Sequence, residues 1–405
     1  MPITFYQHQL ANGLTILGEA NPEAHTSAVG FFVNTGTRDE ERALMGVSHF
    51  LEHMVFKGSA RRCAQDVNRE FDELGADYNA FTGHEATVFY AQVLPEFLPR
   101  ATDLLADLLS PTLREEDFRT EKQVILEEIG MYEDKPAWRL QDLLLEEHYA
   151  GHPLAFRVLG TRESVEALTA AQMTDYFRGR YSPRNITVAA AGKLDFDAFA
   201  GEVERLSGGW LDRPAARTLG EPRPALVQRT FTDRKLNRHY LAAAIPAPPA
   251  QDDHRYAARI LADVLGDVDG SRLYWSLIDP GLADDAAFGY EPQDGTGVYL
   301  AWASCDPKRA AQVEQVLLTT LDAYAAAIDP AEIQRVKNKI ATAATLHGER
   351  PLGRMTSLGG TWLYYQRYIP LEQELARIMA VTADEVRDLL AAWPLDRRTV
   401  VRLGP

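Results

Sequence analysis

The same order of predicted elements occurs twice along this chain of 405 residues. Short apolar runs between turn residues predict strands, and apolar residues at every third or fourth position predict helices. Each half is predicted to contain a strand, a helix, a pair of strands and then two long helices. These elements are residues 28–33, 45–56, 79–82, 87–91, 95–109 and 115–131 in the first half, and 240–245, 253–265, 286–290, 297–303, 310–328 and 330–347 in the second. The repetition indicates an internal duplication of a unit of roughly 200 residues.

This order of elements predicts the fold class α+β. Within each half the paired strands are joined by short turns, which favours antiparallel pairing, and Asn12-Gly13 has the sequence of a tight hairpin turn. The helices between the strands have one apolar face each. We therefore expect two homologous halves, each a mostly antiparallel sheet that helices cover on one face.

A segment rich in glycine and proline separates the two halves. Between residues 207 and 224 the regular spacing of apolar residues is interrupted by Gly208, Gly209, Pro214, Gly220, Pro222 and Pro224. We predict a linker at residues 211–224, an N-terminal domain at 1–210 that bears the metal site, and a C-terminal domain at 225–405 without one.

Composition limits the functional classes. The net charge is −16 and no basic stripe offsets it, which argues against a nucleic-acid partner. Cys63 and Cys305 are far apart in sequence, so we expect reduced thiols, as in a cytosolic protein. Residues 1–10 do not have the pattern of a signal peptide, and no apolar run is long enough to span a membrane. These features predict a cytoplasmic location.

The sequence His-Phe-Leu-Glu-His at residues 49–53 lies within the predicted helix 45–56 of the first half. On a helix, His49, Glu52 and His53 project into one sector. Two neutral imidazoles at this spacing can bind zinc, and a neighbouring carboxylate can accept a proton from water at the metal. A solvated helix face is the alternative, but the residues on both sides of the motif are mostly apolar, which favours ligation.

A catalytic zinc site usually has three protein ligands, so one ligand is missing from this motif. The long helix at 115–131 offers Glu121, Glu127 and Glu128. Glu121 and Glu128 are seven residues apart and share one face of that helix. For Glu127 a solvent-facing position is expected.

Several motifs, in order, give the chain a family resemblance. It resembles the pitrilysin/insulinase family of inverted zincins, in particular the branch of short bacterial members and mitochondrial processing peptidases. The resemblance covers most of the chain and rests on Gly-Thr-Arg-Asp-Glu at 36–40, the motif and its continuation at 49–58, Asn-Ala-Phe-Thr at 79–82, and the segments 121–129, 134–136, 152–154 and 159–161. It implies the fold shared by the metalloenzyme LuxS and the processing peptidases.

The resemblance also implies roles at matching positions. His49 and His53 match the two zinc-binding histidines, and Glu52 matches the general base. Glu128 matches the glutamate that completes the zinc site. Glu121 matches a second acidic position, one that supports catalysis without being a ligand. One Zn²⁺ per chain is therefore expected.

Substrate binding is implied for the strand at residues 79–82. Asn79, Ala80 and Phe81 match the edge strand that holds an extended peptide by strand addition. His84 lies on the following turn, where a solvated histidine is expected.

The second half departs from the family pattern. Self-sufficient members supply an Arg and a Tyr, seven residues apart, to the catalytic chamber. In this chain the Arg position is Ile278, and the Tyr position falls at Asp284 or Asp285. Arg272 and Tyr274 lie nearby, but their spacing differs from that of the pair, so we interpret them as structural.

The implied function is that of a zinc-dependent metalloendopeptidase, which hydrolyses short or unfolded peptides inside a closed chamber. The missing Arg/Tyr pair predicts the metal-bearing subunit of a two-chain enzyme, with a homologous partner chain of similar size. A homodimer is the alternative assembly. A non-catalytic structural or assembly subunit with a vestigial zinc site is the alternative from another functional class. All four residues of the zinc site are present, which favours the enzyme.

Overall fold

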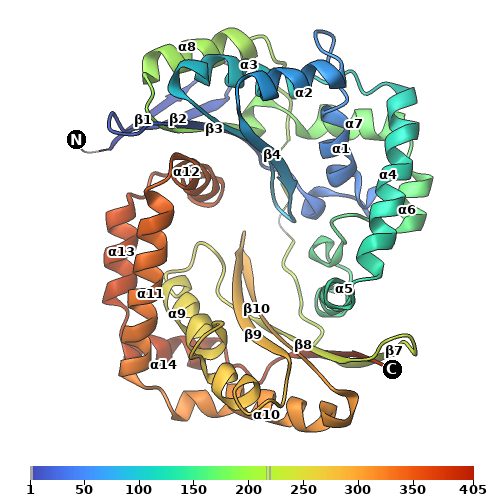
Figure 1. Ribbon diagram of the computed structural model, residues 1–405, viewed down its shortest axis with the longest axis vertical. Coiled ribbons are helices and arrows are strands. Elements are labelled where there is room, and N and C mark those ends of the chain that lie inside the picture. The colour runs from blue at the N-terminus through green and yellow to red at the C-terminus, as the bar shows by residue number, and fades with distance from the viewer. Residues whose placement is uncertain (1–2, 216, 219) are drawn as a thin grey trace. The chain divides into compact units, whose positions relative to one another are not determined.

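The computed structural model of the protein describes residues 3–215, 217–218 and 220–405 (Figure 1). The chain forms two compact units, and neither unit is continuous in sequence. The described residues of the first unit are those up to 129, 156–218 and 345–369, and those of the second are 130–155, 220–344 and 370–405. Each unit therefore includes a segment that the contiguous division into 1–210 and 225–405 assigns to the other half.

The predicted linker, 211–224, has no helix or strand in its described residues. Residues 216 and 219, which fall within this prediction, lie outside the described part of the chain.

The first unit contains a six-stranded sheet in the order β1-β2-β6-β3-β5-β4. Only the pairing of β2 with β6 is parallel among these neighbours. The strands are β1 (Thr4–Gln9), β2 (Thr15–Ala20), β3 (Ser27–Val33), β4 (Asp77–Thr82), β5 (Thr87–Val93) and β6 (Ile186–Gly192). The hairpin turn predicted at Asn12-Gly13 joins β1 to β2, and β4 lies at an edge of the sheet.

Helices pack on both faces of this sheet. On one face the main core contains Phe31, Phe50 and Phe89, which are fully buried. The helices of this part of the unit are α1 (Val47–Val55), α2 (Ala64–Glu73), α3 (Leu98–Leu108), α4 (Glu115–Glu133, of which residues up to 129 belong here), α6 (Arg162–Ala167), α7 (Ala170–Arg180) and α8 (Phe196–Ser207).

The opposite face of the first sheet is covered by α12 (Pro351–Tyr365), which contacts β3 and β6. Its buried Met355 and Trp362 pack in one cluster with Phe32 and Val88 of the sheet. The prediction that helices cover one face only is therefore wrong for this sheet, because the second cover comes from a distant part of the sequence.

The second unit contains a five-stranded sheet in the order β7-β11-β8-β10-β9, in which only β7 and β11 are parallel neighbours. Its strands are β7 (Gln228–Thr232), β8 (His239–Pro246), β9 (Asp285–Gln293), β10 (Thr296–Cys305) and β11 (Thr399–Gly404). On one face α5 (Pro136–His148) contacts β8 and β11 through a small apolar cluster.

A larger cluster, to which α9 and α10 contribute, fills the other face of this second sheet, so the prediction of helices on one face only is wrong for this sheet as well. The helices of the unit besides α5 are α9 (Arg255–Gly266), α10 (Ala310–Ala323), α11 (Pro330–Gly348, of which residues up to 344 belong here), α13 (Leu371–Ala380) and α14 (Ala383–Ala392). Two mostly antiparallel sheets with helices confirm the predicted fold class. Cys63 and Cys305 are free cysteines in the structure. No helix in the described residues is long and apolar enough to cross a membrane.

Candidate metal centre

The H-x-x-E-H motif lies on α1, a helix of nine residues whose other side chains are mostly buried in the main core. The backbone of Gly46, just before the helix, has a φ of 92°. A Cβ atom there would lie 2.6 Å from the carbonyl oxygen of Leu159, so only glycine fits. The Glu40 carboxylate, itself buried, accepts hydrogen bonds of 2.8 Å from the backbone N–H groups of Gly46 and Ser48. These contacts fix the start of the motif helix.

Helix α4 is held against α1 by an aromatic pair. The rings of Phe50 on α1 and Phe118 on α4 stack with their centroids 4.8 Å apart, and both residues are buried. Ile125, one turn before Glu128, is also buried in this core. The apolar face of α4 therefore sets which of its glutamates lie beside the histidines, and these are Glu121 and Glu128.

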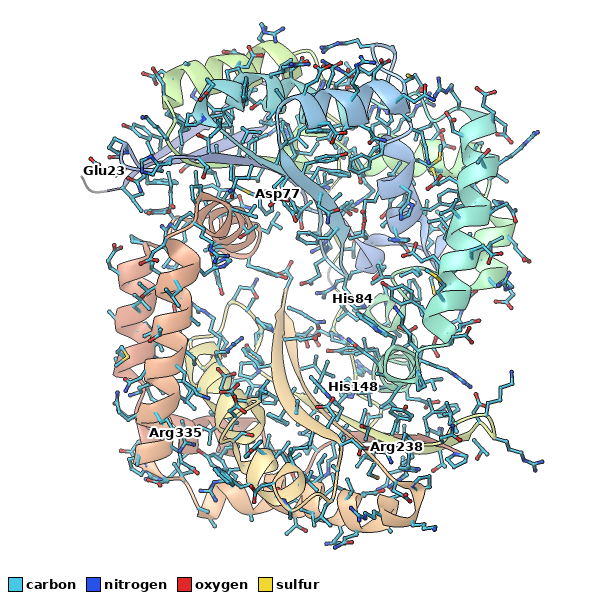
Figure 2. The ribbon with its side chains drawn as sticks, viewed as in Figure 1. Glu23, Asp77, His84, His148, Arg238 and Arg335 are labelled. Carbon is cyan, nitrogen blue, oxygen red and sulfur yellow. The ribbon has the colours of Figure 1, made fainter. Side chains whose placement is uncertain are left out.

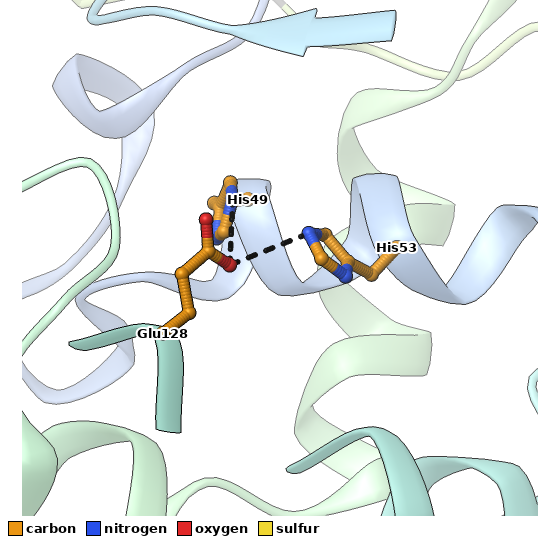
Figure 3. A group of neighbouring side chains, drawn as sticks. All are labelled: His49, His53 and Glu128. Atoms are coloured by element: carbon orange, nitrogen blue, oxygen red, sulfur yellow. Dashed lines mark ion pairs between the residues drawn. The ribbon is translucent and has the colours of Figure 1, made fainter. Parts of the chain in front are cut away.

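His49, His53 and Glu128 converge, as Figure 3 shows. Oε2 of Glu128 lies 3.8 Å from Nε2 of His49 and 3.7 Å from Nε2 of His53. The candidate ligand atoms of the three residues all lie within 4.8 Å of one another. The structure thus brings together the three residues predicted as metal ligands.

These residues fit a zinc ion. Separations of 3.7 and 3.8 Å are too long for hydrogen bonds. Two ligands of a tetrahedral zinc ion lie about 3.4 Å apart, given zinc–ligand bonds of about 2.1 Å. Two imidazole nitrogens and one carboxylate oxygen are also a donor set that zinc prefers. The spacing and the chemistry of the three side chains agree.

Glu121 orients His53. Its Oε1 accepts a 2.9 Å hydrogen bond from Nδ1 of His53, and its Oε2 lies 2.5 Å from Nζ of Lys57. Burial acts to raise the pKa of Glu121, but these two partners outweigh burial and lower that pKa. With Nδ1 donating to Glu121, the Nε2 lone pair of His53 is left to face Glu128.

The pKa values of the two histidines are shifted in opposite directions. Burial, together with the neighbouring His53, lowers the pKa of His49 to about 3, so this imidazole is neutral at physiological pH. Burial also acts to lower the pKa of His53, but the hydrogen bond to Glu121 and the charges of Glu128 and Glu52 outweigh it and raise that pKa.

Glu52 lies in the same sector of α1 and is not among the grouped ligands. Its Oε2 accepts a 2.6 Å hydrogen bond from the hydroxyl of Thr82. Burial raises the pKa of Glu52, against the Thr82 hydrogen bond and the charge of His53, which lower it. A carboxylate with a raised pKa, close to a metal site, is suited to accept and return a proton.

The strand predicted to hold substrate is β4. Phe81 is 48% exposed, Asn79 is exposed and Ala80 is half-buried. Because β4 is an edge strand, one side of its backbone has no strand partner among the described residues. This is the arrangement that strand addition of a peptide requires.

Three residues that were not expected to take part in the zinc site lie outside the group of candidate ligands. Glu127 is exposed, as expected. His84, labelled in Figure 2, is half-buried on the turn after β4 and is not one of the grouped ligands. Arg272 forms a double hydrogen bond with Glu332 and also bonds the carbonyl of Ala327, which are structural contacts within the second unit.

The positions that match the family's Arg/Tyr pair also have local contacts in the second unit. Ile278 packs at the edge of the larger core cluster. Asp284 pairs with Arg238, and Asp285 accepts a hydrogen bond of 3.3 Å from the indole N–H of Trp302.

Three residues close to the site were not predicted to have a role. Lys57 and Thr82 lie within the quoted motifs, but a motif match does not specify their partners. Glu40 also ends a quoted motif, and its burial beneath α1 becomes visible only when the backbone of Gly46 and Ser48 is in place.

Comparisons with known proteins agree with this architecture. Residues 15–162 match the family model "Insulinase (Peptidase family M16)", and residues 167–340 match "Peptidase M16 inactive domain". A protein of Mycobacterium tuberculosis named as an uncharacterized zinc protease is 34% identical, over 98% of this chain and 92% of that relative. YmxG of Bacillus subtilis, also named as an uncharacterized zinc protease, is 29% identical, over 93% of each chain.

A solved protease from Helicobacter pylori has the same fold. It superposes over the whole of both chains with a TM-score of 0.93 at 19% sequence identity. With two homologous halves, the matching family models and relatives named as zinc proteases, this chain belongs to the insulinase family of peptidases, family M16.

Proposed function

We propose that this protein is a zinc-dependent endopeptidase that hydrolyses short or unfolded peptides. The observation that carries the proposal is the convergence of His49, His53 and Glu128, with Glu52 on the same helix. His49, His53 and Glu128 would hold the zinc ion. When bound, zinc acts as a Lewis acid that polarises the scissile carbonyl and acidifies water.

The side chains of this chain carry the remaining steps. An extended peptide adds to the exposed edge of β4, beside Asn79, Ala80 and Phe81. Glu52 accepts the proton of the attacking water and later delivers it to the leaving amine. Glu121 keeps His53 in the orientation that ligation needs.

We further propose that the active enzyme contains two chains. No Arg/Tyr pair is present where self-sufficient members have it, since the corresponding positions are Ile278 and either Asp284 or Asp285. Such a pair would bind the substrate carbonyl and stabilise the oxyanion. A homologous partner of similar size would supply it, and a homodimer is the alternative.

The test combines metal analysis with peptide cleavage. The purified chain should bind one zinc ion and, with its co-purified partner, cleave an unstructured internally quenched peptide. Glu52→Gln should retain zinc while kcat falls by about 10² to 10⁴-fold. A Glu52→Gln rate equal to that of the wild type would contradict the mechanism.

The same assay separates the alternatives. Full activity of the chain alone would contradict the need for a different partner. Bound zinc without hydrolysis, with the partner present, would favour the structural subunit with a vestigial site.

A further inference from the structure

Thr82, the last residue of β4, contacts the proposed general base. Its hydroxyl donates the 2.6 Å hydrogen bond to Oε2 of Glu52. Burial alternates along β4, so that Tyr78, Ala80 and Thr82 are half-buried on the face toward the main core, where α1 also contacts β4. The hydroxyl therefore links the peptide-binding edge strand directly to the helix that carries the motif.

The backbone around Thr82 is held in place from several sides. The turn that follows is closed by a 2.8 Å hydrogen bond from the N–H of Gly83 to the carbonyl of Ala86. The N–H of Arg38 donates to the carbonyl of His84, and the guanidinium of Arg38 pairs at 2.5 Å with the buried carboxylate of Glu85. A side chain fixed at this point can position a neighbour.

Glu52 is a long side chain that needs such support. Ordering a glutamate side chain costs conformational free energy if nothing compensates. In the described structure Oε2 is held by Thr82, whereas Oε1 makes no hydrogen bond with the described residues. One oxygen is thus fixed, and the other is left to exchange a proton.

We propose that Thr82 is a positioning residue, whose hydroxyl holds the Glu52 carboxylate in its working orientation and couples it to the strand that binds the peptide. This inference rests on the proposed function, because it assigns Glu52 the role of general base. It adds a residue that acts through Glu52 and is not one of the proposed metal ligands.

The test compares Thr82→Val, which keeps the shape and removes the donor, with Thr82→Ser, which keeps the donor. Loss of a hydrogen bond to a charged group should lower kcat at least about tenfold in Thr82→Val. KM and zinc content should stay close to those of the wild type, and Thr82→Ser should recover most of kcat. Equal kcat in Thr82→Val and the wild type, or no rescue by serine, would overturn the proposal.

Thr87→Val is the matched control. Thr87 pairs with Thr82 across the hairpin, but its hydroxyl bonds the carbonyl of Thr35. This variant should change Tm and leave kcat unchanged. In a Glu52→Gln background, Thr82→Val should cause no further loss, because Thr82 acts through the carboxylate. An additional tenfold loss there would contradict that route.

Crystal structures separate this inference from the proposed function. In Thr82→Val the Glu52 carboxylate should leave its wild-type position, and in Thr82→Ser it should keep it. This readout holds even if the wild-type protein cleaves no peptide, an outcome that would reject only the peptidase assignment. An unmoved Glu52 in Thr82→Val would reject the positioning role.

Discussion

Nδ1 of His53 donates a 2.9 Å hydrogen bond to Oε1 of Glu121, one helical repeat before Glu128. This second carboxylate fixes the ring of one proposed ligand. Glu121→Gln should therefore weaken zinc binding about 10- to 100-fold, as measured by competition with a chromogenic chelator. Glu127→Gln, on the exposed side of the same helix, is the control and should leave the affinity unchanged. Equal zinc affinity in both variants would refute the orienting role.

Removal of a proposed ligand should have a larger effect. His49→Ala and Glu128→Gln each leave two protein ligands, so both proteins should lose most of their zinc during dialysis against a weak chelator. Circular dichroism should show that their secondary structure remains. If metal analysis finds one zinc ion per chain in either variant after dialysis, the ligand assignment is wrong.

The metal-free protein should be destabilised by acid through His49. The pKa of His49 is about 3 in the folded protein, and its ordinary value, taken for the unfolded chain, is 6.5. Between pH 3 and pH 6.5 the unfolded chain therefore binds one proton more than the folded protein at this residue. The stability from neutral His49 is present above about pH 6.5 and is lost as pH falls toward 3. The decrease in Tm from pH 7 to pH 4 should be smaller in His49→Gln than in the wild type. Parallel Tm profiles would argue against this assignment.

The aromatic pair between α1 and α4 should couple stability to metal binding. Phe118→Ala removes the ring that stacks on Phe50 and leaves a cavity, so the free energy of unfolding should fall by about 3–5 kcal/mol in urea titrations. Zinc affinity should fall too, because α4 carries Glu128. Val124→Ala, at a position that is 46% exposed, should change stability by less than about 0.5 kcal/mol. A stable Phe118→Ala protein with normal zinc affinity would show that the helices are held by other contacts.

The sequence predicted the local elements and the composition of the site, because both depend on short-range patterns. The turn at Gly13, the helix around His49 and His53, and the long helix with Glu128 all follow from turn residues and apolar spacing. Spacing alone could not select Glu128 over Glu121, since both share a face of α4. The family resemblance made that choice. In the structure Glu128 faces Nε2 of both histidines, whereas Glu121 bonds Nδ1 of His53.

Features that depend on long-range packing were not predictable. The hydrogen bond from Thr82 to Glu52 joins residues 30 positions apart, and the cap that Glu40 provides requires the left-handed turn at Gly46. The helix α12 and its place on the first sheet were also missed. The sequence of residues 351–365 does not show which surface of the protein their apolar side chains pack against.

The position of α12 in the sequence has a consequence for synthesis of the protein on the ribosome. The last strand of the first sheet ends at Gly192, but α12 starts only at Pro351. Translation proceeds at about 5–20 residues per second, so roughly 8–30 s pass between synthesis of the last strand and synthesis of the helix that covers Phe32 and Val88. During this interval the apolar side chains on that face lack the cover of α12, and such transiently exposed surface is prone to aggregation. Translation must therefore pass residue 365 before the unit that carries the metal site can complete its fold.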